Sequence, residues 1–240
     1  MGNQVFNIEE AIRRGLIGRP GKRPELTREE MEELKARQRE SERTGGMDDL
    51  FKDLEDHGIM IPNARLRLEW NVTRADIEKM FNYVLARMGR NERCVWNDDY
   101  DAILDWMNGS DGKNLFIAGG CGLGKTIFGR YVIPAMLYER ERKVMTTCSM
   151  YDAGKRLGEL LRSGILSLDD IGVENESVTY GERRDPFVEL VENIDANGKL
   201  AVFTSNIGVD EMKKRYGERT VDRLVGMSRY VGVKGKSMRR

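Results

Sequence analysis

Apolar and polar residues follow a regular order along most of this 240-residue chain. Short apolar runs, bounded by glycine or charged residues, alternate with stretches that have the i, i+3, i+4 spacing of amphipathic helices. Four of these runs predict buried strands, at residues 114–118, 144–148, 165–168 and 200–204. This alternation favours a parallel sheet covered by helices, and therefore an α/β fold.

Helices are predicted before and between these strands. Thr73 caps one whose apolar side chains, from Ile77 to Met88, keep to one face for three turns. The other predicted helices span residues 100–108, 151–162, 185–195 and 218–224. Pro134 lies inside the helix expected after the first strand and should kink it, because proline cannot donate a backbone hydrogen bond.

The first sixty residues have a different pattern. Glycine and proline punctuate residues 1–24, which predicts a loop or a flexible arm. A capping box at Thr27 and Glu30 predicts a polar helix to about Thr44. A short apolar stripe then follows at helical spacing, formed by Met47, Leu50, Phe51 and Leu54. The stripe either packs on the core of this protein or docks on a partner.

The charge balance excludes a generally basic protein that coats nucleic acid, because 40 basic residues face 40 acidic ones. Charge is nevertheless uneven: residues 210–240 carry ten basic and four acidic side chains. This basic end either follows a phosphate backbone or forms the surface that faces nucleotide and a neighbouring subunit.

Membrane and zinc-binding classes find no support in the sequence. No run reaches the roughly 20 apolar residues of a membrane span, and the amino terminus lacks the order of a signal peptide. We therefore expect a cytoplasmic protein without a membrane partner. Three isolated cysteines and the single His57 give no spacing typical of a zinc site, and we expect His57 to be a surface residue.

A phosphate-binding loop follows the first predicted strand. The sequence GGCGLGKT, Gly119 to Thr126, matches G-x-x-x-x-G-K-[ST] at every fixed position and lies between a strand and a helix. The predicted nucleotide-binding residues are Gly119, Gly120, Cys121, Gly122, Leu123, Gly124, Lys125, Thr126 and Ile127. We expect Lys125 to face solvent until ATP binds and then to contact the β and γ phosphates, while Thr126 ligates Mg²⁺.

Polar residues at the ends of two later strands complete the predicted site. Asp169 and Asp170 follow the third apolar run, and we expect Asp169 to hold the metal and Asp170 to act as general base toward water. After the fourth run, Asn206, or failing that Ser205, is predicted to bind that water or the γ phosphate.

Five motifs in this order resemble the AAA+ ATPases of the DnaC/IstB-like family, which contains helicase loaders and transposase helper ATPases. They are GGCGLGKT (119–126), LDDIG (168–172), FTSN (203–206), YGERTVDRL (216–224) and GKSMR (235–239), and they cover about half of the chain. The chain departs from the loader pattern in one respect, because only one helix fits between the second and third strands.

The resemblance implies a role for each matching residue. Asn206 matches the sensor that orients water, and Arg239 matches the sensor arginine near the carboxyl terminus. Arg223 matches the arginine finger that acts on a neighbouring subunit's ATP, with Arg219 as a second candidate. An arginine finger implies a homo-oligomer, arranged as a ring or an open helix. The short segment after Arg223 implies a core without a separate helical lid.

These inferences predict three parts and one function. Residues 1–62 form a partner-binding arm, residues 63–112 a helical linker packed on the core, and residues 113–240 an AAA+ ATPase core. The predicted function is ATP-dependent loading of a hexameric replicative helicase onto DNA, with the arm binding the helicase. The alternatives are a transposition helper that binds duplex DNA and a transposase, and, less favoured, a small-molecule kinase.

Overall fold

The computed structural model describes most of the chain as two units. The described residues are 32, 47–58, 65–173, 177–179 and 182–237. Backbone contacts divide the chain into Met1–Ile61 and Pro62–Arg240, which we describe separately. The first unit contains helix α3 (Met47–Asp56), as the spacing of the apolar stripe predicts. Apart from Glu32, the helix expected at 27–44 lies outside the described residues, as does Arg239.

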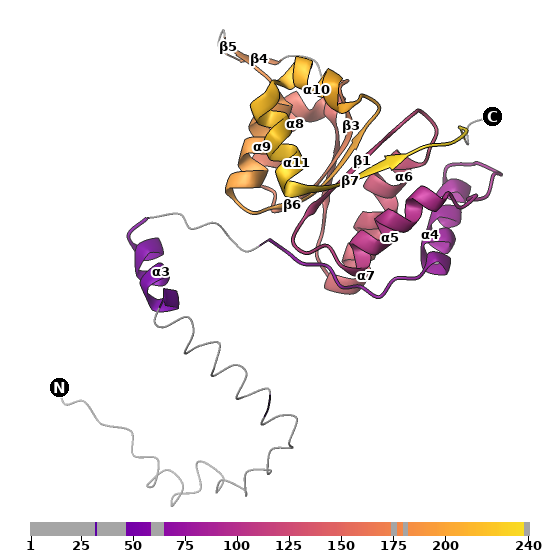
Figure 1. Ribbon diagram of the computed structural model, residues 1–240, viewed down its shortest axis with the longest axis horizontal. Coiled ribbons are helices and arrows are strands. Elements are labelled where there is room, and N and C mark those ends of the chain that lie inside the picture. Colours follow the sequence, from indigo (N-terminus) through magenta and orange to yellow (C-terminus); the bar gives the residue numbers. More distant parts are fainter. Residues whose placement is uncertain (1–31, 33–46, 59–64, 174–176, 180–181, 238–240) are drawn as a thin grey trace, which may run out of the picture. The chain divides into compact units, whose positions relative to one another are not determined.

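The second unit is built on a parallel sheet (Figure 1). Its strands are β1 (Asn114–Gly119), β2 (Thr146–Ser149), β3 (Ile165–Ile171), β6 (Leu200–Ser205) and β7 (Ser228–Val233). They lie in the order β2-β3-β6-β1-β7, and every neighbouring pair is parallel. A separate antiparallel pair, β4 (Ser177–Thr179) and β5 (Glu182–Arg184), lies between β3 and the next helix along the chain. The prediction of a P-loop α/β core with a parallel sheet is confirmed.

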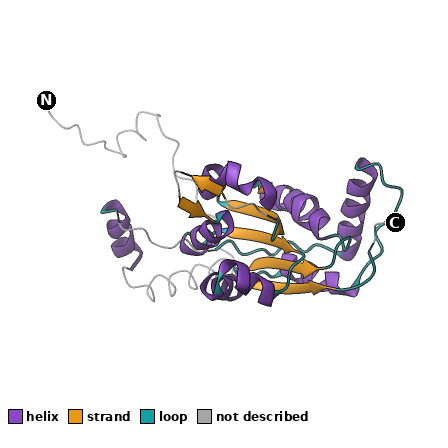
Figure 2. Ribbon diagram, turned by 90° about the horizontal axis from the view of Figure 1, so that it is seen from above, coloured by secondary structure: helices purple, strands orange, loops and turns teal. Residues whose placement is uncertain are grey.

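Helices cover both faces of the sheet (Figures 1 and 2). On one face lie α4 (Arg74–Arg87), α5 (Asp101–Asn108), α6 (Lys125–Ile127) and α7 (Ile133–Glu141). On the other face lie α8 (Met150–Arg162), α9 (Pro186–Ala196), α10 (Val209–Tyr216) and α11 (Glu218–Met227). None of the helices in the described ranges has the length and apolar character needed to cross a bilayer.

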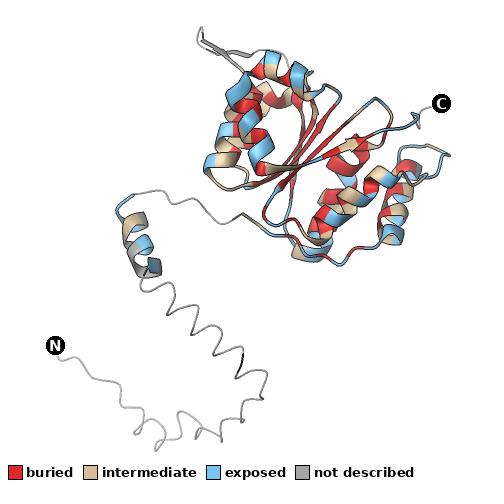
Figure 3. Cartoon of the chain, in the orientation of Figure 1, coloured by how far each residue is buried: buried red, intermediate tan, exposed pale blue. Residues whose placement is uncertain are grey.

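The sheet separates the hydrophobic core into two clusters, one on each face, and successive side chains of a strand point into different clusters. Leu115 and Ile117 belong to the cluster under α4 to α7, whereas Phe116 and Ala118 belong to the cluster under α8 to α11. The alternation follows from the pleat, which sends successive side chains to opposite faces. Because both faces are covered, the strands and the inner sides of the helices are buried together (Figure 3).

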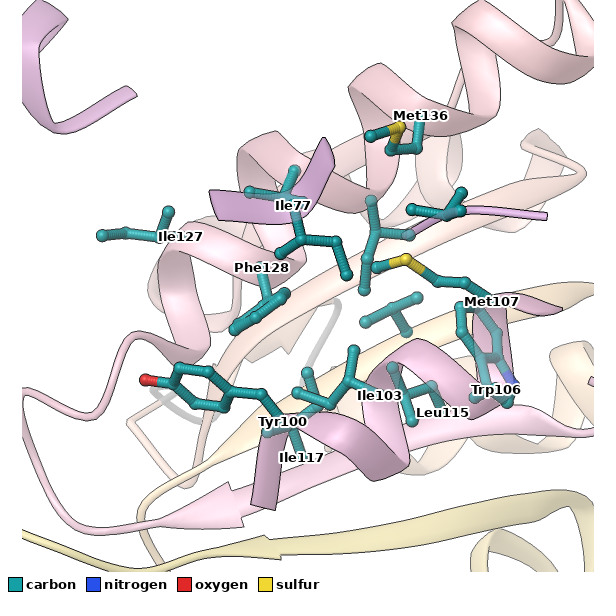
Figure 4. Close-up of a cluster of buried hydrophobic side chains, with 14 of the residues drawn as sticks. Ile77, Tyr100, Ile103, Trp106, Met107, Leu115, Ile117, Ile127, Phe128 and Met136 are labelled. Atoms are coloured by element: carbon teal, nitrogen blue, oxygen red, sulfur yellow. The ribbon is translucent and has the colours of Figure 1, made fainter. Parts of the chain in front are cut away.

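The first cluster connects the core to the phosphate loop (Figure 4). The rings of Tyr100 and Phe128 pack edge to face with centroids 4.8 Å apart. Tyr100 comes from the short helix η1 (Asp98–Tyr100), and its hydroxyl donates a hydrogen bond to the Leu123 carbonyl oxygen at 3.0 Å. The aromatic core therefore fixes the position of the loop that follows β1.

The helix after the phosphate loop is irregular near Pro134. It begins as α6, continues as a π-helical turn, η2 (Phe128–Val132), and becomes α7 at Ile133. Pro134 lies in the first turn of α7, where its missing N–H is tolerated because the preceding turn no longer has α-helical bonding. A π turn therefore precedes Pro134, and the kink expected there stays a prediction.

The structure adds elements that the sequence pattern does not predict. These are strands β4, β5 and β7 and helix α10. In addition, β3 extends beyond residue 168 through both aspartates to Ile171. One helix, α8, connects β2 to β3, as the spacing predicts. In the described part of the chain, strand β7 follows α11 and is the last element. The division at residues 62 and 112 stays a prediction.

Candidate nucleotide-binding site

The phosphate loop between β1 and α6 depends on the backbone freedom of glycine. Gly122 and Gly124 have φ angles of 79° and 74°, in the left-handed region that glycine adopts readily. The loop ends where α6 begins at Lys125, so its N–H groups lie beside the first turn of a helix. Backbone N–H groups in such a turn, together with a helix amino terminus, favour the binding of phosphate oxygens.

Lys125 is buried, and the expectation that it faces solvent before ATP binds is wrong. Its side chain is 5% exposed. The ammonium Nζ donates hydrogen bonds to the Gly120 carbonyl oxygen and to Asn206 Oδ1, both at 2.7 Å. A buried charge is costly unless it is hydrogen-bonded, and these two oxygens meet that need.

Asn206 connects Lys125 to Asp170. The Asn206 Nδ2 donates to Asp170 Oδ1 at 3.3 Å, so the three side chains form a hydrogen-bonded series at the carboxyl ends of β1, β3 and β6. Ser205, the alternative residue, is buried and donates to the Ile171 carbonyl oxygen at 2.9 Å. Ser205 also accepts a hydrogen bond from the Ile207 N–H at 3.1 Å, so it joins the end of β6 to β3 and to the turn that follows. Asn206, in contrast, lines the pocket at the phosphate loop.

Asp170 occupies an unusual backbone conformation. Its φ of 58° lies in the left-handed region, which residues other than glycine adopt at a cost. The Asp170 N–H donates to Thr204 Oγ1 at 3.0 Å, and the pairing of β3 with β6 is irregular between Leu168 and Ile171. This irregularity allows Asp170 to line the pocket while the preceding residue, Asp169, points into the protein. Strained backbone of this kind is often found at functional sites.

Asp169 is buried beside two hydroxyl groups. Thr204 Oγ1 donates to Asp169 Oδ1 at 2.6 Å, and Thr126 of the phosphate loop also forms a side-chain hydrogen bond with this carboxylate. Burial raises the pKa of Asp169 above its ordinary value, and the adjacent charge of Asp170 adds to the rise. The hydrogen bonds from Thr204 and Thr126 oppose this rise in pKa because they favour the ionised form.

The pocket at the phosphate loop is completed by residues that the sequence did not suggest. They are Leu85 and Met88 at the end of α4, and Arg90, Glu92 and Arg93 in the loop that follows. These side chains lie about thirty residues before the loop in the sequence. Their only local signal is a group of charged residues after a helix end, which is common on any protein surface.

The two finger candidates on α11 have different surroundings. Arg223 forms an ion pair with Glu192 of α9, with Nη1 and Oε1 2.9 Å apart. Arg219, one turn earlier, is exposed. Neither residue lines the phosphate-loop pocket of its own chain.

Comparisons with known proteins find only solved structures of low identity, and those described here have TM-scores below 0.5. No family model matches the sequence, and no match is found among curated proteins. A solved structure of the DnaC helicase loader is 23% identical, covers 51% of this chain and 79% of its own, and has a TM-score of 0.43. That of DnaI is 20% identical, with coverages of 53% and 73% and a TM-score of 0.42. AMPPCP-bound DnaA from Aquifex aeolicus is 19% identical, with coverages of 56% and 45% and a TM-score of 0.43. Function has to be inferred from the site itself.

We expect Lys125→Ala to lose nucleotide affinity by more than about tenfold, because the substitution removes a charged donor from the phosphate loop. Calorimetric titration with Mg·ATP measures the change, and circular dichroism checks that the variant is folded. Lys155→Ala is the matched control, since that lysine is exposed on α8. Unchanged affinity in Lys125→Ala would contradict the phosphate-loop assignment.

We also expect Cys121 to react first among the three cysteines with a maleimide at pH 8, and Mg·ATP to protect it. Cys121 is exposed and lines the pocket. Burial raises the pKa of the Cys94 thiol to about 11 and also raises that of Cys148, so both carry little reactive thiolate. Mass spectrometry of peptides gives the rate at each site. Equal labelling of Cys121 with and without saturating Mg·ATP would argue against nucleotide in this pocket.

Proposed function

We propose that this chain binds ATP at the phosphate loop and hydrolyses it. The observation that carries the proposal is the hydrogen-bonded series Lys125–Asn206–Asp170, which lies beside the adjacent pair Thr126 and Asp169. These side chains provide a cation for phosphate, an amide to orient water, a carboxylate to accept a proton and two oxygen ligands for a metal. This is the set of groups that phosphoryl transfer to water requires.

The oxygen atoms of Thr126 and Asp169 suit a magnesium ion. Mg²⁺ prefers hard oxygen ligands and is usually held by one or two protein groups, with phosphates and water completing the shell. The described residues contain no group of three His, Cys, Asp or Glu side chains that would bind a metal alone. When bound, the ion neutralises charge on the phosphates. Because burial makes the Asp169 charge costly, a neighbouring cation would stabilise the ionised carboxylate.

Asp170 and Asn206 act on the attacking water in this proposal. Asp170 accepts the proton that water loses, and the Asn206 amide holds the water in line with the γ phosphate. The two side chains are already within 3.3 Å of each other. Aspartate is shorter than glutamate, so the water must approach closely or a second water must relay the proton.

Arg223 is proposed to act on the ATP of a neighbouring subunit. The residue is absent from the pocket of its own chain, and its resemblance to the arginine finger requires subunits that stack head to tail. Its ion pair with Glu192 is partly exposed, with side-chain exposures of 31% and 51%, and such a pair costs at most about 1 kcal/mol to break. The pair therefore does not prevent Arg223 from turning toward a neighbour.

We expect Arg223→Ala to bind ATP almost normally and to lose turnover, by up to about 10³-fold, because arginine fingers act on the transition state. Mixing this variant with Asp170→Asn should restore part of the activity at interfaces that combine one intact half from each. Arg219→Ala, changed one turn away on the same helix, is the matched control. Mixtures no more active than the separate variants would contradict catalysis in trans, and loss only in Arg219→Ala would assign the finger to Arg219.

The cellular role that we propose is the loading of a hexameric replicative helicase onto DNA, with the arm recruiting the helicase. Its support is the ordered set of five motifs and helix α3. On this helix Met47 and Phe51 are 52% and 45% exposed, and both belong to the apolar stripe. Large apolar side chains contribute about 1.5–3 kcal/mol each when fully buried, before the cost of ordering. We propose that DNA is bound by the assembled oligomer, as a single strand or a duplex.

We expect the double substitution Met47→Ser and Phe51→Ser to abolish capture of the purified replicative helicase by the full chain. ATP affinity and melting temperature should stay nearly unchanged, because both side chains are exposed. The control is Lys52→Ser with Asp56→Ser, which changes exposed polar positions of the same helix. A melting temperature many degrees lower would show that the stripe is core, and capture of a purified transposase alone would favour the transposition helper.

A further inference from the structure

We propose that residues Lys234–Ser237 form a strap that holds the phosphate loop in its nucleotide-binding conformation, and that Asn97 and Asp99 are positioning residues that anchor it. This inference rests on the proposed nucleotide binding and extends it to residues outside the loop. The strap is the segment that follows β7, and its role is independent of the arginines that come after it.

The strap is anchored to η1 by two hydrogen bonds. The Lys234 N–H donates to Asp99 Oδ2 at 2.7 Å, and Asn97 Nδ2 donates to the Lys234 carbonyl oxygen at 2.5 Å. Asn97 Oδ1 also accepts from the Asp99 N–H at 3.0 Å, which caps this short helix. The backbone N–H and carbonyl oxygen of Lys234 are therefore both hydrogen-bonded to η1, which lies far away in the sequence.

Beyond its anchor the strap passes directly over the outer turn of the phosphate loop. A Cβ atom at Gly122 would overlap the hydroxyl of Ser237 in the strap. One at Gly119 would overlap the carbonyl oxygen of Val233, the last residue of β7 before the strap. A Cβ at Gly235 would lie 3.9 Å from a methyl group of Leu123. Two glycines of the motif are thus needed for the close approach of the carboxyl-terminal segment as well as for their own conformation.

The loop is consequently held from two sides by groups of the same turn. Tyr100 at the end of η1 donates to the Leu123 carbonyl oxygen at 3.0 Å, and the strap, anchored at the start of η1, contacts Gly122. A loop that is already ordered loses less conformational entropy when it binds phosphate. Coupling between two binding equilibria is reciprocal. If the attached strap increases the affinity for nucleotide by some factor, bound nucleotide increases the equilibrium constant for attachment of the strap by the same factor.

The test compares two adjacent aspartates in the full chain. Asp99→Ala removes the acceptor for Lys234 and should raise the Kd for Mg·ATP about three- to tenfold, the effect of one lost hydrogen bond. Asp98→Ala is the matched control, because Asp98 is exposed on the same turn and the structure gives it no bond to the strap. Asp99→Asn keeps an acceptor oxygen and should restore most of the affinity. Asn97→Asp, which keeps the cap of η1 but removes the donor, should weaken binding like Asp99→Ala.

A second measurement follows the strap itself. Limited trypsin digestion cuts after Lys234 and Lys236, and mass spectrometry gives the rate. Mg·ATP should slow this cleavage in the wild-type protein, and Asp99→Ala should reduce the protection. Equal Kd values in Asp99→Ala and Asp98→Ala would overturn the proposed role of the strap and leave the proposed function standing. The same holds if Mg·ATP binds to the wild-type protein but does not change the rate of cleavage. Absence of nucleotide binding by the wild-type protein would overturn the proposed function and the strap together.

Discussion

The buried ammonium of Lys125 is the constraint around which the site is organised. A charge at 5% exposure requires hydrogen-bonding partners, and it finds them in the loop carbonyl of Gly120 and the amide oxygen of Asn206. The second partner orients Asn206 so that its amide nitrogen faces Asp170. One electrostatic requirement thus connects the phosphate loop to the two strands that carry the other polar groups of the site.

Strand order makes this connection possible. β6 lies between β1 and β3, so residues at or just beyond the carboxyl ends of three separate strands meet at one end of the sheet. Their side chains come from segments that are up to 81 residues apart, the separation between Lys125 and Asn206. The covering helices contribute indirectly, because Tyr100 packs against Phe81 of α4 and Phe128 of η2 and bonds the loop at Leu123. The rigid core therefore determines where the loop lies, and the loop determines where phosphate can bind.

Prediction from sequence succeeded where the pattern of apolar and polar residues within a segment is sufficient to identify its secondary structure. The buried strands β1 and β6 and the capped helix α4 have strong local patterns, because both faces of the sheet are covered and one side of the helix is buried. β7 was missed for the opposite reason. It lies at the edge of the sheet and, among the strands that the structure describes, pairs with β1 alone. Its residue Tyr230 is 53% exposed, and within this strand only Val231 and Val233 are buried apolar residues. Such a strand forms because β1 supplies a partner for its backbone.

The sequence by itself determined the α/β class, the phosphate loop and the carboxylates after the third apolar run, since each depends on residue type and spacing along the chain. Only the tertiary structure decided that Lys125 is buried, that Asn206 rather than Ser205 reaches the pocket, and that Arg90 and Glu92 also line it. It also decided that the carboxyl-terminal segment crosses the loop at Gly122. These facts depend on contacts between segments distant in sequence, which strand order and packing create and which no local pattern encodes.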